Sequence, residues 1–329
     1  MKPFPLLTIM DLKVAFDTEQ GRIHAVDNVG FSLEKGSILG IAGESGCGKS
    51  VTALSIIRLL PKPMSSIVAG KILFQGQDLL AIPIRQMQQI RGRKIAMIFQ
   101  EPMTALNPVH SVGRQMSEVF ALHFPHMTAS AMQKKAVTML DRVGIPDPGQ
   151  VCKKYPHQLS GGIRQRVMIA MALSCEPDIL IADEPTTALD VTIQAQILEL
   201  IKDLREKTGM SIILITHDLG VIAENCDHVV VMYAGRIAET ADVRALFRRP
   251  LHPYTKGLLT SIPSRAKTAK ILLPTIAGSV PSLSDMPDGC RFADRCPLAE
   301  DLCRQELPLE KPVGKDRTAA CHLVPRTST

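Results

Sequence analysis

One segment near the N-terminus combines glycines, a lysine and a serine in an order suited to binding a phosphate chain. Residues 43–50 read Gly-Glu-Ser-Gly-Cys-Gly-Lys-Ser and fit the pattern G-x-x-x-x-G-K-[ST] at each fixed position. The glycines let the backbone wrap phosphates with its N–H groups turned inward. Lys49 can reach the β- and γ-phosphates, and the Ser50 hydroxyl can bind Mg²⁺. The predicted nucleotide-binding segment comprises Gly43, Glu44, Ser45, Gly46, Cys47, Gly48, Lys49, Ser50 and Val51.

A second segment adds two carboxylates to this chemistry. Ile179-Leu180-Ile181-Ala182 is an apolar run followed directly by Asp183 and Glu184. A buried strand would bring Asp183 to the C-terminal edge of a sheet, where it can hold Mg²⁺. Glu184 comes next and can polarise an attacking water. The alternative is that the two acids merely begin a surface loop, and the phosphate-binding pattern argues against it.

Strands and helices that could position these residues alternate along the first 250 residues. Buried apolar strands are expected at residues 37–42, 94–99, 178–182 and 211–216. Helices are expected at residues 49–60, 112–145, 161–174 and 191–207, the first stopped by Pro61. Buried strands separated by helices predict an α/β core with a mainly parallel sheet. Residues 262–288 are rich in Pro and Ser and are expected to be a loop or linker.

Further segments resemble, in order, the motifs of the ATP-binding-cassette (ABC) ATPases. Leu159-Ser160-Gly161-Gly162 precedes an expected helix and resembles the signature sequence of that family. Gln100 follows a strand, as the Q-loop glutamine does, and residues 187–190 (Thr-Ala-Leu-Asp) resemble the D-loop. His217 follows a strand and resembles the switch histidine, and Phe16 lies where the family places an aromatic ring against adenine.

The resemblance implies a P-loop ABC core with an antiparallel β part, and a helical subdomain at about residues 101–160. It implies ATP and Mg²⁺ as ligands, with Ser50, Gln100 and Asp183 holding the metal. The implied catalytic residues are Glu184, His217 and Gln100. Ser160, Gly161, Gly162 and Asp190 would contact ATP held by a partner subunit, although Ser160 could instead be only a helix cap. The signature departs from the usual pattern at Ile163, where most members have Gln.

The part of the chain beyond about residue 250 exceeds what such a cassette needs. Residues 249–255 (Arg-Pro-Leu-His-Pro-Tyr-Thr), residues 100–108 and residues 155–158 resemble the D-type ATPase subunits of dipeptide and oligopeptide permeases. We therefore expect a nucleotide-binding domain at residues 1–250 and a C-terminal extension at residues 251–329. Nickel and glutathione importers are neighbours of this subfamily, so another cargo is the alternative.

Four of the eight cysteines lie in this extension, with the spacing C-x5-C-x6-C-x17-C. Four thiols in a short tail of a reduced compartment suggest a metal site rather than disulfides. Similar tails in peptide-permease ATPases are understood to carry iron–sulfur clusters, so the resemblance implies a [4Fe–4S] cluster on Cys290, Cys296, Cys303 and Cys321. A Zn²⁺ site and free or disulfide-bonded thiols are the alternatives. The other four cysteines are expected to be small buried side chains.

Composition excludes several other classes of protein. Apolar residues make up 45% and charged residues 21%, which excludes general disorder. The net charge of +6 is scattered and there is no Trp, which argues against a nucleic-acid surface. No apolar run reaches the roughly 18–20 residues that span a bilayer. A non-transport ABC ATPase acting on DNA or ribosomes is the rival in a different class.

The resemblance therefore implies an ATP-hydrolysing subunit that energises peptide import at the cytoplasmic face of a bacterial inner membrane. The implied partners are a paralogous ATPase subunit, two integral membrane permease subunits and an external substrate-binding protein, with no nucleic acid.

Overall fold

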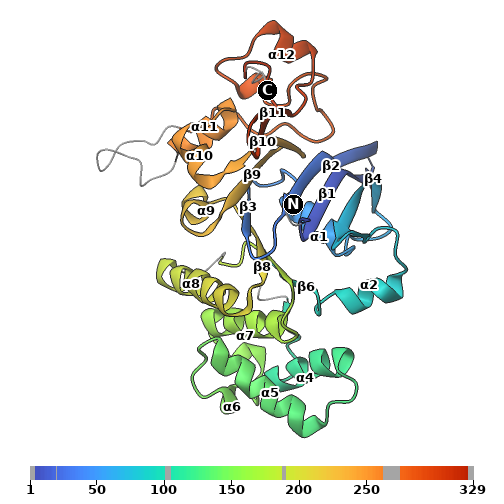
Figure 1. Ribbon diagram of the computed structural model, residues 1–329, viewed down its shortest axis with the longest axis vertical. Coiled ribbons are helices and arrows are strands. Elements are labelled where there is room, and N and C mark those ends of the chain that lie inside the picture. The colour runs from blue at the N-terminus through green and yellow to red at the C-terminus, as the bar shows by residue number, and fades with distance from the viewer. Residues whose placement is uncertain (1–3, 20, 101–104, 187–189, 262–274, 325–329) are drawn as a thin grey trace. The chain divides into compact units, whose positions relative to one another are not determined.

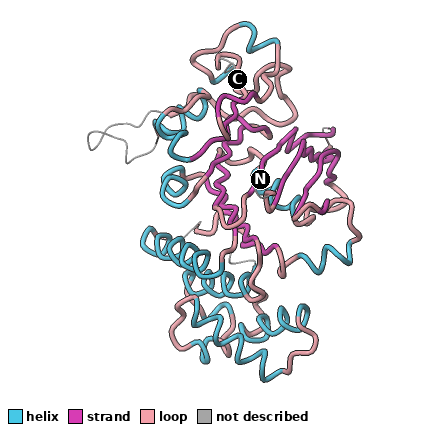
Figure 2. The backbone as a smooth tube through the Cα atoms, in the orientation of Figure 1, coloured by secondary structure: helices cyan, strands magenta, loops and turns pink. Residues whose placement is uncertain are grey.

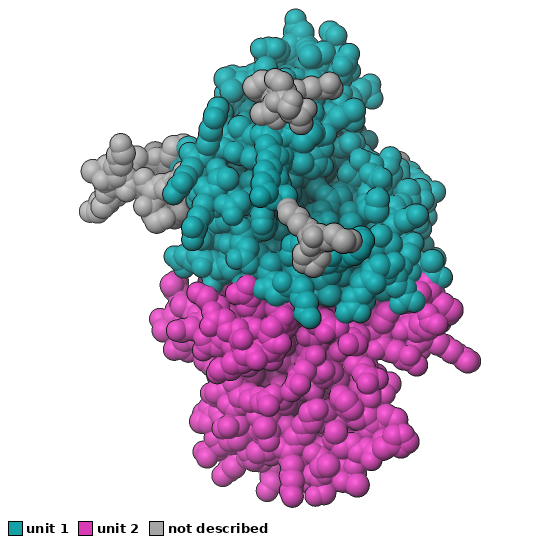
Figure 3. Space-filling model, in the orientation of Figure 1, with its two compact units in different colours: residues 1–81, 214–329 teal, residues 82–213 magenta. Residues whose placement is uncertain are grey.

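The structure is a computed structural model that describes residues 4–19, 21–100, 105–186, 190–261 and 275–324. These residues form two compact units (Figure 3). The first unit combines Met1–Ala81 with Leu214–Thr329, and the second is Ile82–Ile213. Strand β8 (Ser211–Thr216) is divided between them.

An antiparallel sheet in the first unit begins the chain (Figure 1). Its strand order is β2-β1-β4-β5, formed by β1 (Leu7–Thr18), β2 (Gly21–Leu33), β4 (Ser65–Phe74) and β5 (Gln77–Asp78). Leu7, Ile9, Leu12 and Val14 of β1 are buried. Register shifts interrupt the β1–β2 pairing between Ile9 and Ala15. This sheet is the antiparallel part that the family resemblance implies.

The other strands of the first unit follow the order β11-β12-β10-β9-β3. They are β3 (Ile38–Ala42), β9 (His228–Tyr233), β10 (Arg236–Asp242), β11 (Lys311–Gly314) and β12 (Arg317–Ala319). The helices of this unit are α1 (Lys49–Ile56), α9 (Leu219–Asn225), α10 (Val243–Arg248), α11 (Pro253–Thr260), η3 (Ala293–Arg295) and α12 (Asp301–Gln305). Strand β12 of the C-terminal extension pairs with β10, so the extension joins this sheet.

The second unit contains mostly helices (Figure 2). Its elements are α2 (Ile84–Ile90), β6 (Ile95–Ile98), α4 (Val112–His123), α5 (Ala129–Arg142), α6 (Pro148–Val151), η1 (Pro156–Gln158), α7 (Gly161–Leu173), β7 (Ile179–Asp183) and α8 (Val191–Thr208). Strands β6 and β7 pair in parallel, and every residue of β7 is buried.

Two sequence expectations need correction. The helical stretch at residues 112–145 is two helices, because the chain turns after His123 and the Thr128 side chain caps α5 by accepting from the Ala131 N–H. Helix α1 ends at Ile56 rather than near residue 60, because Arg58 adopts a left-handed φ of 54°.

The sheet that contains β3 includes both parallel and antiparallel pairs. Strands β3 and β9 pair in parallel, as do β6 and β7, whereas β9–β10, β10–β12 and β11–β12 are antiparallel. The β9–β10 hairpin turns through Ala234 and Gly235, both at positive φ, which is the turn geometry that matches the twist of paired strands.

Candidate nucleotide site

The phosphate-binding segment lies between β3 and α1, as predicted. Glycine is required at both ends of the turn, where Gly43 has a φ of 150° and Gly48 a φ of 100°. A Cβ on Gly43 would lie 2.2 Å from the Met232 carbonyl oxygen, and one on Gly48 would lie 2.6 Å from the Ala25 carbonyl oxygen. The loop is therefore packed against the backbone of its own unit, while Ser45 and Gly46 at its tip are exposed.

Lys49 is 5% exposed and is held by the loop itself. Its Nζ donates to the carbonyl oxygens of Gly43, at 2.7 Å, and Glu44, at 2.9 Å. The neighbouring Cys47 is buried, and burial raises the pKa of its thiol despite the nearby lysine. Cys47 is therefore a packing residue of the loop, and Lys49 is the cation available to a phosphate chain.

Contacts from residues far along the chain also hold the loop. The Glu44 N–H donates to the Tyr254 hydroxyl at 2.9 Å, and the Glu44 carboxylate accepts from Arg295 at 2.7 and 3.0 Å. Tyr254 and Arg295 are parts of this site that the sequence does not predict. The segment at residues 249–255 indicates only the subfamily, and nothing in the local pattern around Arg295 marks a loop contact.

In the second unit, Gln100 and Glu184 are brought together. Gln100 follows β6, and its Nε2 donates to the Glu184 Oε2 at 3.1 Å. Asp183 ends β7 and is 3% exposed. Glu184 has a φ of 45°, an uncommon conformation for a residue with a side chain. Carboxylate and amide oxygens are hard donors that suit Mg²⁺, so these residues fit the metal that the sequence analysis expects.

Two motif residues begin helices of the second unit. The Ser160 hydroxyl caps α7 by accepting from the Ile163 N–H at 3.4 Å. The Asp190 carboxylate caps α8 by accepting from the Ile193 N–H at 2.9 Å. Gly161 is exposed at the first turn of α7. The N-terminus of α7 therefore presents backbone donors together with Ser160, which is compatible with either a cap or an anion site. Thr187, Ala188 and Leu189 of the D-loop lie outside the described residues.

The remaining predicted site residues are in the first unit. Phe16 is half-buried on β1, opposite Ile23 of β2 and Ser65 of β4. His217 is exposed immediately after β8.

The four cysteines of the extension also gather in the first unit. Cys303 and Cys321 are buried, and Cys290 and Cys296 are half-buried. Burial raises the pKa of Cys290 to about 11, and the charges of Cys303, Cys321 and Cys296 contribute to this rise. The four thiols are thus near enough to influence one another. Within the described residues, however, no three His, Cys, Asp or Glu side chains lie close enough to hold one metal ion.

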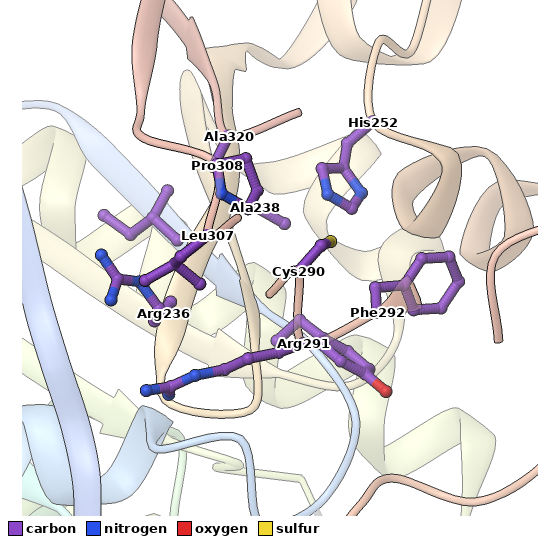
Figure 4. A pocket seen from close by; sticks show the side chains of 11 residues that line it. Arg236, Ala238, His252, Cys290, Arg291, Phe292, Leu307, Pro308 and Ala320 are labelled. Atoms are coloured by element: carbon purple, nitrogen blue, oxygen red, sulfur yellow. The ribbon is translucent and has the colours of Figure 1, made fainter. Parts of the chain in front are cut away.

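A small cavity of about 30 Å³ adjoins this cysteine group (Figure 4). Cys290, His252, Arg291 and Phe292 are among the side chains that line it. The volume suffices for a water molecule but not for a nucleotide.

In the part of the chain that the structure describes, no helix has the length and apolarity needed to cross a bilayer.

Comparison with known families gives two main matches. A family model described as "ABC transporter" matches residues 26–187, and one described as "Oligopeptide/dipeptide transporter, C-terminal region" matches residues 238–303. The first match contains the loop at residues 43–50 and the Asp183–Glu184 pair. The second contains three of the four extension cysteines.

Similar proteins match nearly the whole chain. A probable peptide ABC transporter ATP-binding protein of Sinorhizobium fredii is 53% identical over 96% of this chain and 94% of its own length. The dipeptide transport ATP-binding protein DppD of Bacillus subtilis is 52% identical over 97% of this chain and 94% of its own length. Among solved structures, a dimeric ATP-binding cassette in a post-hydrolysis state with ADP and Pi matches with a TM-score of 0.65 and 26% identity, covering 72% of this chain and 99% of that one.

Proposed function

The chain belongs to the ABC transporter ATP-binding subunits that carry the oligopeptide/dipeptide C-terminal region, and on that premise we propose that it hydrolyses ATP to drive import of dipeptides or oligopeptides. The observation that carries the proposal is the ordered phosphate loop, held by Lys49 and packed glycines, in a chain about half identical to peptide-transport subunits along almost all of its length. The relatives do not favour nickel or glutathione as cargo, or action on nucleic acid.

The residue roles follow from the family resemblance and the chemistry of the side chains. Gly43 to Val51 would bind the phosphates, Phe16 would contact adenine, and Ser50, Asp183 and Gln100 would hold Mg²⁺. When bound, Mg²⁺ would supply positive charge that neutralises the phosphates. Glu184 orients and polarises the attacking water, and His217 steadies the γ-phosphate. Phosphoryl transfer to water is mainly a matter of positioning and charge stabilisation, which these groups supply.

The subunit works in a complex. A paralogous ATPase subunit would supply the second cassette, so that Ser160, Gly161, Gly162 and Asp190 face ATP held by the partner's phosphate loop. The domain boundary near residue 250 would separate the cassette from the extension. Two membrane permease subunits and an external substrate-binding protein would complete an importer at the cytoplasmic face of the inner membrane.

The extension is proposed to carry a [4Fe–4S] cluster on Cys290, Cys296, Cys303 and Cys321. Four thiolates are a suitable donor set for either a cluster or Zn²⁺, and the mutual influence of their charges supports a shared site. A brown protein with iron and acid-labile sulfide supports this assignment, whereas a colourless anaerobic preparation with stoichiometric zinc and no iron contradicts it.

Transport itself is tested by reconstituting the chain with its permease and ATPase partners in vesicles and measuring uptake of a labelled dipeptide. We expect ATP-dependent uptake that the Lys49→Ala variant abolishes. Nickel added in place of the dipeptide is the control cargo. ATPase activity stimulated by DNA, with no peptide uptake, would overturn the proposal.

A further inference from the structure

Glu44 of the phosphate loop is held at all three of its polar groups. Its N–H donates to Tyr254, its carbonyl oxygen accepts from Lys49, and its carboxylate receives two hydrogen bonds from Arg295. Tyr254 is fully buried, so its hydroxyl is a fixed acceptor. Glu44 is thus the loop residue that Tyr254 and Arg295, from the C-terminal part of the chain, contact directly.

Arg295 is fixed in a formed site rather than lying on the surface. Its side chain is 6% exposed, whereas that of Glu44 is 30% exposed. Besides the paired bonds to Glu44, its Nε donates to the Ala277 carbonyl oxygen at 2.9 Å and one terminal nitrogen donates to the Tyr233 hydroxyl at 3.3 Å. The guanidinium also lies over the rings of Tyr233, at 5.7 Å, and Phe292, at 6.0 Å. A two-point guanidinium–carboxylate contact fixes orientation as well as distance, so Glu44 has little freedom.

The backbone around Arg295 belongs to the cysteine group. Arg295 ends η3 and directly precedes Cys296, whose N–H donates to the Ala293 carbonyl oxygen at 3.2 Å. The Ala293 N–H in turn donates to the Cys290 carbonyl oxygen at 2.9 Å, and the Cys290 N–H donates to that of Cys303 at 2.7 Å. A Cβ on Gly289 would lie 2.5 Å from the carbonyl oxygens of Cys303 and Arg304, so these two backbone segments are in close contact. A change in the packing of these cysteines is therefore expected to shift the backbone of Arg295.

We propose that Arg295 is a positioning residue for ATP binding, which sets the shape of the phosphate loop through Glu44 and couples the cysteine group of the extension to nucleotide affinity. The inference rests on the proposed function, because it takes residues 43–50 as the ATP site.

Two physical effects act in the same direction. A loop fixed before binding loses less conformational freedom when it closes on the phosphates. Arg295 also neutralises a carboxylate that would otherwise face an anionic ligand. Loss of Arg295 therefore weakens ATP binding, whereas the groups proposed to act on water are untouched.

The experiment uses the full chain and measures Mg-ATP affinity by calorimetry, together with KM and kcat in the assembled transporter. Arg295→Met is expected to raise the Kd and KM about tenfold, within the usual range of coupling between two sites, with little change in kcat. Arg295→Lys keeps the charge and is expected to recover part of the affinity. Glu44→Gln removes the carboxylate charge that Arg295→Met leaves uncompensated. The double variant should therefore lose less ATP-binding free energy than the sum of the losses in the two single variants.

Two arginines of the same extension provide matched controls. Arg291 is 13% exposed, pairs with Asp27 at 2.6 Å and donates to the Ala234 carbonyl oxygen. Arg291→Met therefore removes another buried link between extension and core, one whose partners lie outside residues 43–50. Arg304 is 59% exposed and pairs with Asp294 at 2.8 Å. Neither Arg291→Met nor Arg304→Met is expected to raise the Kd for ATP. Cys303→Ser should weaken ATP binding, and should add little once Arg295 has been replaced.

The outcomes separate this inference from its premise. Unchanged ATP affinity in Arg295→Met, or an equal rise in Kd for Arg291→Met, would overturn the positioning role, whatever the melting temperatures. If Arg295→Met does not fold, Arg295→Lys and Glu44→Gln decide by the same measurement, since unchanged affinity in both has the same meaning. If the unaltered chain does not bind ATP, or Lys49→Ala binds it equally well, the proposed function itself fails.

Discussion

Glu184 of the proposed site has a backbone conformation that differs from that of the strand before it. It follows the fully buried strand β7, yet it adopts a positive φ of 45°. Such a conformation costs on the order of 1–3 kcal/mol and persists only where neighbouring contacts impose it. One such contact is the hydrogen bond from Gln100. The result is a carboxylate held at a set position by an amide, as a water-orienting group requires.

We predict that Glu184→Gln binds ATP with near-normal affinity but loses at least about two orders of magnitude in hydrolysis, the usual effect of removing a group that transfers a proton. The amide retains the size of the side chain and can still meet Gln100, so the change isolates the loss of charge. Nucleotide binding is measured by calorimetry, and hydrolysis by phosphate release in the assembled transporter. Turnover near that of the unaltered protein would contradict the role assigned to Glu184.

At the scale of elements, only the contiguous part of the site could be predicted from sequence. The phosphate loop is one continuous segment between a strand and a helix that are short apolar runs, so the local sequence pattern was enough to predict it. Arg295 and Tyr254 reach Glu44 from 251 and 210 residues away, and no periodicity encodes such a contact. The register shifts in β1 break the alternation of apolar residues, which is why strand patterns there gave no signal.

Helix α11 provides a pH-dependent element. The His252 ring caps it by accepting from the Tyr254 N–H at 3.1 Å, and burial lowers the pKa of His252 from 6.5 to about 4. Between these values the unfolded chain binds a proton that the folded chain does not, so stability falls as the pH drops from 6.5 towards 4. The effect amounts to at most about 3 kcal/mol.

His252→Asn tests this dependence, because Asn also caps helices but does not titrate. We expect the denaturation midpoint of the unaltered chain to fall more steeply between pH 7 and pH 5 than that of the variant. If the denaturation midpoints of the two proteins fall equally with pH, His252 does not contribute to the pH dependence of stability.

The pairing of β10 with β12 contains a buried ion pair. Glu239 on β10 is fully buried and accepts from Arg317 at 2.8 Å and from the Leu251 and His252 N–H groups. Arg317→Met should cost about 3–5 kcal/mol, because it leaves a buried carboxylate without its counter-charge. Adding Glu239→Gln should recover much of the lost free energy of unfolding. Arg304→Met, which removes an exposed pair, should cost less than about 1 kcal/mol in the same unfolding measurement.

At the scale of the whole molecule, the division of motifs between chains leads to a mixing test. In the proposed arrangement each ATP lies between the phosphate loop of one subunit and the Ser160-Gly161-Gly162 segment of the other. Lys49→Ala removes the loop's cation, and Ser160→Arg blocks the segment, so each variant alone as a pair of identical chains would have no intact site. A mixed pair of the two variants would regain one intact site, formed by the unaltered loop of one chain and the unaltered segment of the other.

This outcome distinguishes the two possible working pairs. If a paralogous subunit is the natural partner, mixing the two variants of this chain in the assembled transporter should restore no hydrolysis, because the two never face each other. Each variant combined with the unaltered paralogue should instead lose a different one of the two sites. Recovery of hydrolysis on mixing would show that two copies of this chain pair, and would contradict the paralogue. Folding of each variant is checked by its melting temperature. Because Ser160 caps α7, its replacement alone should cost about 1 kcal/mol and lower that temperature by only a few degrees.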